Sequence, residues 1–246
     1  MVQSKTQKGT VAMMAGFAVS IIAGLAFGIG ICAWMFIFLF SGILWVAGIG
    51  WIYGERDKFK EQHSKSVEAA AWLFGISALI YTIAILFVVV QTWTFIMSDS
   101  GATFTNQQTK MIIDTHIYFG YMFLMATVML AASRVFAVIE LQNRNGKRLT
   151  VLAFVAMLAI IIVVSAQNNI YLTDQNTANQ KNGNSFFKKD IDSQLSGVYG
   201  KSILESPGYL PMGIILPVFS ELLFILAYRS CHSRFSKGEL KPRTRE

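Results

Sequence analysis

The segment "ILPVFSELLFILAYR" (residues 215–229) places one carboxylate, Glu221, inside an apolar run long enough to form a helix. An acid at the centre of a membrane costs at least about 2.5 kcal/mol, so it should be paired, protonated, or turned toward protein or water. Pro217, four residues earlier, has no N–H and predicts a kink one turn before the acid. This layout is typical of ion or proton sites. The alternative is an acid that is hydrogen-bonded to a neighbouring helix and only holds that helix in place.

A second group of polar residues is predicted at the outer ends of the apolar segments. Asp114 and His116 begin one segment, Gln167 and Asn168 end the next, and Gln91 lies near the end of another. Antiparallel threading would bring them to similar depth, which predicts a polar, outward-facing vestibule with one titratable imidazole. The alternative is ordinary polarity where helices leave a membrane.

The motifs of common enzymes are absent. The sequence has no G-x-S-x-G, H-E-x-x-H or Walker A motif. Asp114 and His116 are two residues apart and point in different directions on a helix, so they form no dyad. Haem held by two histidines is not expected, because His63 and His232 are predicted at the opposite end from His116. We expect no cofactor and no metal, and an intramembrane enzyme using His116 is the third hypothesis.

Composition predicts the elements that must position these residues. Of 246 residues, 54% are apolar and 14% are charged, against about 25% charged in soluble domains. No charged residue or histidine occurs between Val11 and Tyr53. The other long apolar blocks are 67–97, 111–133, 149–171 and 209–229. Because each block exceeds the length of about 18 residues that a membrane helix needs, we expect an integral membrane protein.

The first apolar block is too long for one helix. At about 1.5 Å per residue it would reach roughly 65 Å, twice the thickness of the hydrocarbon core. Two helices joined by a tight turn near Gly28–Trp34 fit better. The sequence therefore predicts an all-α bundle in one membrane domain, with six spans near 11–31, 33–53, 67–97, 111–133, 149–171 and 209–229.

The distribution of basic residues predicts the orientation. With both termini in the cytoplasm, the inner segments carry fifteen Lys and Arg and the outer segments carry five, as the positive-inside rule requires. The net charge of +7 then reflects topology, and no nucleic-acid partner is expected. Membrane lipids are expected partners, and the basic tail 230–246 would attract anionic head groups. The long outer loop, 172–208, is either a lid or partner site, or a plain connector.

Small residues form a ridge along the first span. Ala12, Gly16, Ser20, Gly24 and Gly28 recur every four residues. In lipid such a ridge lets helix backbones approach closely. The neighbouring helix belongs either to the same chain, which we favour, or to another subunit of a homo-oligomer or membrane complex.

Three further predictions concern the inner end. Arg134 lies where the fourth span leaves the membrane, and we expect it to extend to the head groups as an anchor. The segment 55–66, "ERDKFKEQHSKS", mixes charges and is predicted to be a solvated connector. Cys32 and Cys231 are predicted on opposite sides of the membrane and cannot pair. Cys231 is either a small interfacial residue, which we favour, or a palmitoylation site.

Two hypotheses for function follow. The first is movement of a small solute, proton or ion across the membrane, with Glu221 as the gating or coupling residue and the outer vestibule as its access. The second is a non-catalytic structural or organising subunit of a membrane complex, which would bind partners through the small-residue ridge or the outer loop.

Overall fold

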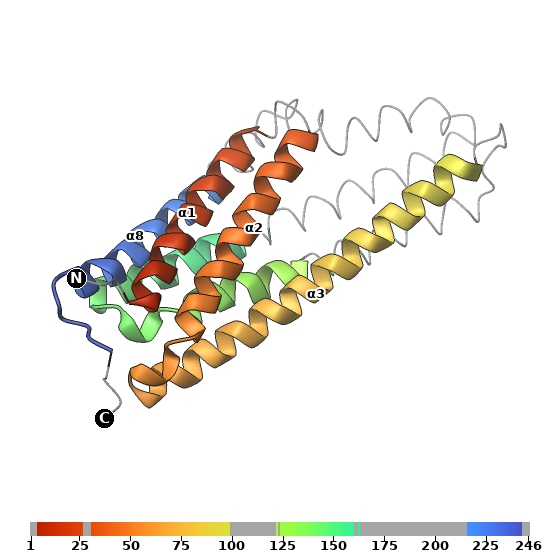
Figure 1. Cartoon of the computed structure of the whole chain (residues 1–246). Helices are drawn as coiled ribbons and strands as arrows, with labels where there is room; N and C mark the ends of the chain where they lie inside the picture. Colours follow the sequence, from red (N-terminus) through yellow and green to blue (C-terminus); the bar gives the residue numbers. More distant parts are fainter. Residues whose placement is uncertain are drawn as a thin grey trace.

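The computed structural model describes residues 4–26, 31–98, 122, 124–159, 162 and 216–242. Throughout these residues the chain is helical or in short turns and contains no strand, which confirms the all-α prediction. The labelled helices in Figure 1 are α1 (Lys5–Ala26), α2 (Ile31–Tyr53), α3 (Glu61–Ser98) and α8 (Leu216–Ser236). Helical residues 124–136 and 144–159 and two 3₁₀ turns, η1 (Arg56–Lys58) and η2 (Ile139–Leu141), complete the description.

Two antiparallel helices, α1 and α2, occupy the first apolar block, and they pack very closely. A Cβ atom added at Gly9 would lie 2.7 Å from the carbonyl oxygen of Gly48, and one added at Gly48 would lie 2.7 Å from Cγ of Met13. The hydroxyl of Ser41 donates a hydrogen bond of 2.8 Å to the carbonyl oxygen of Gly16. Glycine is needed at these points because the two backbones approach within a distance that leaves no room for a side chain.

The helices meet at a common end. The first turn of α1, the turn containing η1 and the last turns of α8 lie together at the lower left of Figure 1. We call this the basal end. Above it, α1, α2, α8 and residues 124–136 enclose a core that includes Phe17, Trp45, Leu130, Phe224 and Tyr228. This core surrounds the candidate site.

The prediction of a solvated connector for segment 55–66 holds for one side of the segment only. Asp57, Lys58, Lys60, Glu61, Gln62 and Lys65 are exposed, but the other side is folded against the bundle. Glu55, Phe59 and His63 are buried. The backbone N–H of Thr6 donates a 2.9 Å hydrogen bond to Glu55, and the ring of Phe59 packs edge-on against Phe235 with centroids 5.8 Å apart. The charges at the other positions concealed these three inward-facing residues. Together they close the basal end.

Two helical segments in the described residues, Glu61–Ala84 and Leu124–Leu141, are long and apolar enough to cross a membrane by length and composition. They overlap the third and fourth predicted spans. Insertion into a membrane and the six-span topology remain predictions. The outer loop 172–208 lies outside the described residues.

Candidate functional site

The candidate site is a buried ion pair that joins three parts of the bundle. Glu221 on α8 is 6% exposed, and Arg134, at the end of helical residues 124–136, is 3% exposed. Nη1 of Arg134 donates a hydrogen bond of 3.0 Å to Oε1 of Glu221. The hydroxyl of Ser20 on α1 donates a longer bond of 3.5 Å to the same oxygen. Opposite charges from two distant segments are therefore paired inside the core.

Aromatic rings surround the guanidinium group of Arg134. Its Cζ lies 4.0 Å from the centroid of the Trp45 ring, 5.2 Å from that of Phe17 and 5.7 Å from that of Phe224. The rings of Phe17 and Phe224 stack with centroids 5.4 Å apart. The negative faces of these rings stabilise the cation in an apolar environment.

Arg134 points into the bundle, so the prediction that it extends to the head groups is wrong. The hydroxyl of Tyr228 donates a 2.7 Å hydrogen bond to the backbone carbonyl of Arg134. Glu221 lies seven residues before Tyr228, roughly 10 Å along the helix axis. The arginine side chain therefore runs away from the basal end. The carboxylate of Glu221 and the aromatic faces satisfy it there, in place of lipid phosphates.

Two residues of the small-residue ridge shape this site. A Cβ atom at Gly16 would lie 2.5 Å from Cδ1 and Nε1 of Trp45, so the glycine lets the indole ring lie flat beside Arg134. Ser20, one turn further along α1, contacts Glu221. Ala12 is also buried. The ridge thus packs within the chain at Gly16 and Ser20, whereas the surroundings of Gly24 and Gly28 lie outside the described residues.

The hydrogen bonding of the pair is incomplete. Oε2 of Glu221 and Nε of Arg134 are buried and have no hydrogen-bond partner among the described residues. Most buried polar atoms in proteins have such a partner, so each exception calls for an explanation. One oxygen of the carboxylate, Oε2, therefore accepts no hydrogen bond from the described residues.

The other predicted site residues cannot be placed beside this pair. Asp114, His116, Gln167 and Asn168, which define the predicted vestibule, lie outside the described residues. Gln91 belongs to α3, but its side chain is not described.

The predicted kink at Pro217 also falls at the limit of the description. Pro217 is the second residue of α8, and the preceding residues, 211–215, lie outside the described part. Near the other end of α8, Cys231 is completely buried. Lipid modification requires an accessible thiol, so this burial disfavours palmitoylation, and the small interfacial residue stays a prediction.

The partner of Glu221 is what sequence reasoning missed. Arg134 stands in an otherwise apolar stretch, and a buried acid needs a base. That signal was available, although the separation of 87 residues concealed it. Within the described ranges no group of three or more His, Cys, Asp or Glu could hold a metal ion.

Comparison with known proteins gives no further guide. The chain matches no protein-family model, and no similar protein was found among curated sequences or solved structures. Function must therefore be argued from the residues themselves.

Proposed function

We propose that this chain is an integral membrane protein with six spans, with its basal end and both termini in the cytoplasm. The outward surface of α3 supports insertion in lipid. Trp72 is 68% exposed, Leu79 60% and Val90 61%. An arginine and two glutamates are buried inside the same bundle. Apolar side chains outside and paired charges inside are the arrangement that lipid, rather than water, favours.

Hydrogen bonds between the helices support the same proposal. Three serine hydroxyls donate to backbone carbonyl oxygens of other helices, with distances of 2.7, 2.7 and 3.0 Å: Ser77 to Ala126, Ser133 to Ala70, and Ser220 to Ala153. Small residues and hydroxyl groups at helix contacts are typical of membrane bundles, where the hydrophobic effect does not drive helix association.

We propose further that the protein moves a small solute, a proton or an ion, and that Glu221 couples this movement to a change in helix packing. The observation that carries this proposal is the buried Arg134–Glu221 pair with one free carboxylate oxygen. A proton or cation at Oε2 weakens the attraction to Arg134. Since Ser20 and Arg134 meet Glu221 from different elements, binding at this oxygen loosens α8 from both neighbours. Such a bistable contact can alternate access between the two sides.

The test is flux through purified protein in liposomes. The probes are protons, driven by a valinomycin-imposed potassium gradient and followed with a trapped pH dye, and then sodium and chloride. Glu221→Gln should reduce the flux at least tenfold while the protein elutes as folded material. Glu55→Gln is the control, since Glu55 has the same small solvent exposure but both of its carboxylate oxygens have partners. It should keep most of the flux. Absence of flux for every probe, or equal flux in wild type and Glu221→Gln, would overturn the proposal.

The second candidate is a structural subunit of a membrane complex. Gly42 and Gly50 on α2 favour it, because a Cβ atom added at either position would meet nothing within 4 Å. This open glycine surface would let a partner helix approach closely. If this candidate is correct, Gly42→Leu with Gly50→Leu abolishes assembly in a cross-linking assay, and Glu221→Gln does not.

A further inference from the structure

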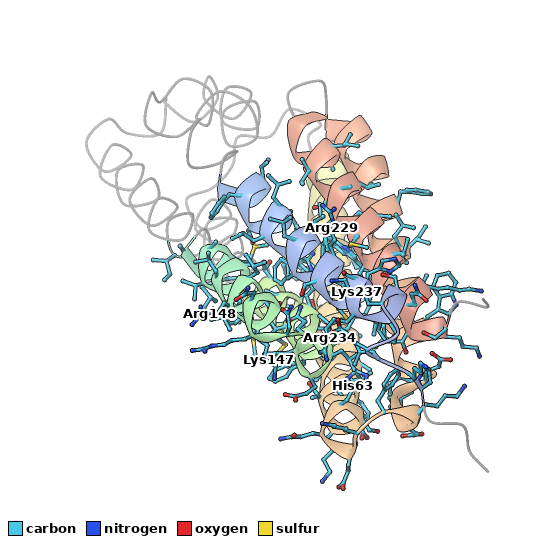
Figure 2. The ribbon with its side chains drawn as sticks, turned by 90° about the vertical axis from the view of Figure 1, so that its left-hand side faces the viewer. His63, Lys147, Arg148, Arg229, Arg234 and Lys237 are labelled. Atoms are coloured by element: carbon cyan, nitrogen blue, oxygen red, sulfur yellow. The ribbon has the colours of Figure 1, made fainter. Side chains whose placement is uncertain are left out.

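A cavity of about 430 Å³ opens at the basal end. It lies between the segment 58–63, η2 with the residues flanking it, and the chain after α8. Arg234 closes one side of it, because its Nη1 donates a 2.7 Å hydrogen bond to the carbonyl oxygen of Leu141. Figure 2 shows His63, Arg234 and Lys147 at this end of the molecule. The cavity is well separated along α8 from the Arg134–Glu221 pair.

The lining of the cavity carries an excess of positive charge. Its basic residues are Lys58, Lys60, Lys147, Arg234 and Lys241, against two acids, Glu140 and Glu239.

Both acids are already paired. Nζ of Lys147 lies 3.7 Å from Glu140, and Nε of Arg234 lies 3.1 Å from Glu239. Lys60 and Lys241 form no ion pair with any described residue. Two ammonium groups of the lining therefore lack an ion-pair partner among the described residues, and a ligand that they attract would be an anion.

His63 supplies an unpartnered polar group on the same wall. Its side chain is 1% exposed, and neither ring nitrogen has a hydrogen-bond partner within the described part of the chain. Phe59 packs edge-on against the imidazole, with centroids 5.2 Å apart. Burial lowers the pKa of His63 to about 4, so the ring is neutral at pH 7 and carries one N–H. A buried donor without an acceptor is suited to an anion with oxygen acceptors. Because both ring nitrogens are buried, an anion in the cavity would reach the N–H only when the imidazole turns toward it.

We propose that this cavity binds a phosphate group, either the head group of an anionic lipid or free phosphate, with Lys60 and Lys241 as its charge partners and His63 as a hydrogen-bond donor. A phosphate offers several acceptor oxygens, and lysine binds it as a point charge. Basic pockets on the cytoplasmic side of membrane bundles are well placed to meet lipid phosphates. The lipid source rests on the proposed membrane orientation. Phosphate binding as such does not depend on transport.

The test is titration of the purified full chain in a zwitterionic detergent at 150 mM salt. The probes are inorganic phosphate, a short-chain phosphatidylinositol phosphate, and short-chain phosphatidylcholine as the zwitterionic control, each measured by calorimetry. The variant is Lys60→Ala with Lys241→Ala. The control variant, Lys65→Ala with Lys237→Ala, removes the same charge from exposed residues that do not line the cavity. All four lysines are on the surface, so both variants should fold.

We expect one of the two phosphate probes to bind and phosphatidylcholine not to bind. Stronger binding of the inositol lipid identifies a head-group site, and stronger binding of inorganic phosphate identifies a solute site. Lys60→Ala with Lys241→Ala should raise the Kd at least tenfold, and the control variant should change it less than twofold. His63→Gln should weaken binding by a smaller factor. The proposal is overturned if neither phosphate probe binds, or if both double variants weaken binding equally, which would indicate general charge attraction. Loss of flux in Glu221→Gln does not affect these outcomes.

Discussion

Two carboxylates in this protein have the same small solvent exposure, but Glu221 lies deeper in the protein and the two are hydrogen-bonded differently. Glu55 and Glu221 are each 6% exposed. Oε2 of Glu55 accepts hydrogen bonds from the backbone N–H and the hydroxyl of Thr6, and Oε1 lies 3.4 Å from Nζ of Lys58. In Glu221, Oε1 accepts from Arg134 and Ser20, whereas Oε2 has no partner in the described residues.

This difference separates a structural acid from a candidate functional one. Glu55 meets the first turn of α1, where unpaired N–H groups and the helix dipole favour a negative charge. Burial raises the pKa of Glu55, but the hydrogen bonds from Thr6, Lys5 and Lys58 outweigh it and leave the pKa below the ordinary value of 4.5. Glu221 has one strong partner on a different segment of the chain. Glu55 is also held by a distant segment, through Thr6, so what distinguishes Glu221 is the oxygen that has no hydrogen-bond partner among the described residues.

We expect removal of Arg134 to lower the free energy of unfolding more than any other change considered below. Arg134→Met leaves a buried carboxylate without its partner and should lower the free energy of unfolding by about 3–5 kcal/mol. The double variant Arg134→Met with Glu221→Met should recover most of this stability, because an apolar pair of similar volume fits the aromatic surroundings. It should still lack flux. Denaturant titration in detergent measures the stabilities, and a double variant as unstable as Arg134→Met would refute the pairing.

His63 is another buried titratable group, and neither of its ring nitrogens has a hydrogen-bond partner among the described residues, whereas Glu221 lacks a partner only at Oε2. The pKa of His63 is lowered from 6.5 to about 4 by burial. Between these values the unfolded chain binds more protons, so stability is complete above pH 6.5 and falls by roughly 3 kcal/mol as the pH drops to 4. Thermal unfolding between pH 7 and pH 4 should show this loss, and His63→Phe should remove it. An unchanged pH dependence in that variant would contradict the burial of a neutral imidazole.

A change in the contact between Gly16 and Trp45, next to the ion pair, should lower the free energy of unfolding by a smaller amount. Gly16→Ala places a methyl group against Trp45 and should cost about 1–3 kcal/mol by overpacking. It should also displace the indole ring from Arg134, which tryptophan fluorescence would detect. Gly42→Ala on α2, where no atom of the described residues lies within 4 Å, is the matched control. It should leave the fluorescence unchanged and the stability unchanged or slightly higher, because alanine favours a helix more than glycine does. Equal stability of the two variants would show that α1 and α2 are not closely packed at Gly16.

We expect the smallest change in the free energy of unfolding from substitution of Glu55. Glu55→Gln keeps an acceptor for Thr6 and removes the charge near the start of α1, so it should cost about 1 kcal/mol. Because the pKa of Glu55 lies below 4.5 in the folded state, its contribution is complete above that pH and is lost as the pH falls further. Unfolding of the variant should therefore depend less on pH below 4.5. A loss of flux in Glu55→Gln would break the distinction between the two acids.

The sequence predicted the helical class well because long apolar blocks leave little alternative. The length of the first block required two helices, and α1 and α2 occupy it. Because the apolar segments are hydrophobic on all sides, their sequence did not indicate which face of each helix points into the bundle. For that reason the direction of Arg134, whose Cα lies at a span end, was predicted wrongly.

Segment 55–66, at the basal end, shows that composition alone does not predict which residues of a segment are buried. Residues 55–66 contain enough charge to resemble a solvated loop, yet Phe59 and His63, one helical turn apart in sequence, both point inward. Glu55 is buried because the N-terminus of α1 approaches it, a contact across 49 residues that no local pattern contains.

Thiol labelling at Ser20 would show whether water or an ion reaches Glu221. Ser20→Cys is nearly isosteric, lies beside Oε1 of Glu221 and leaves the ion pair intact. With Cys32 and Cys231 replaced by serine, sealed vesicles are treated with a membrane-impermeant thiol reagent from each side separately. We expect labelling of folded protein from at least one side. A thiol that stays unlabelled from both sides, and reacts only after unfolding, would contradict this expectation and favour a purely structural pair.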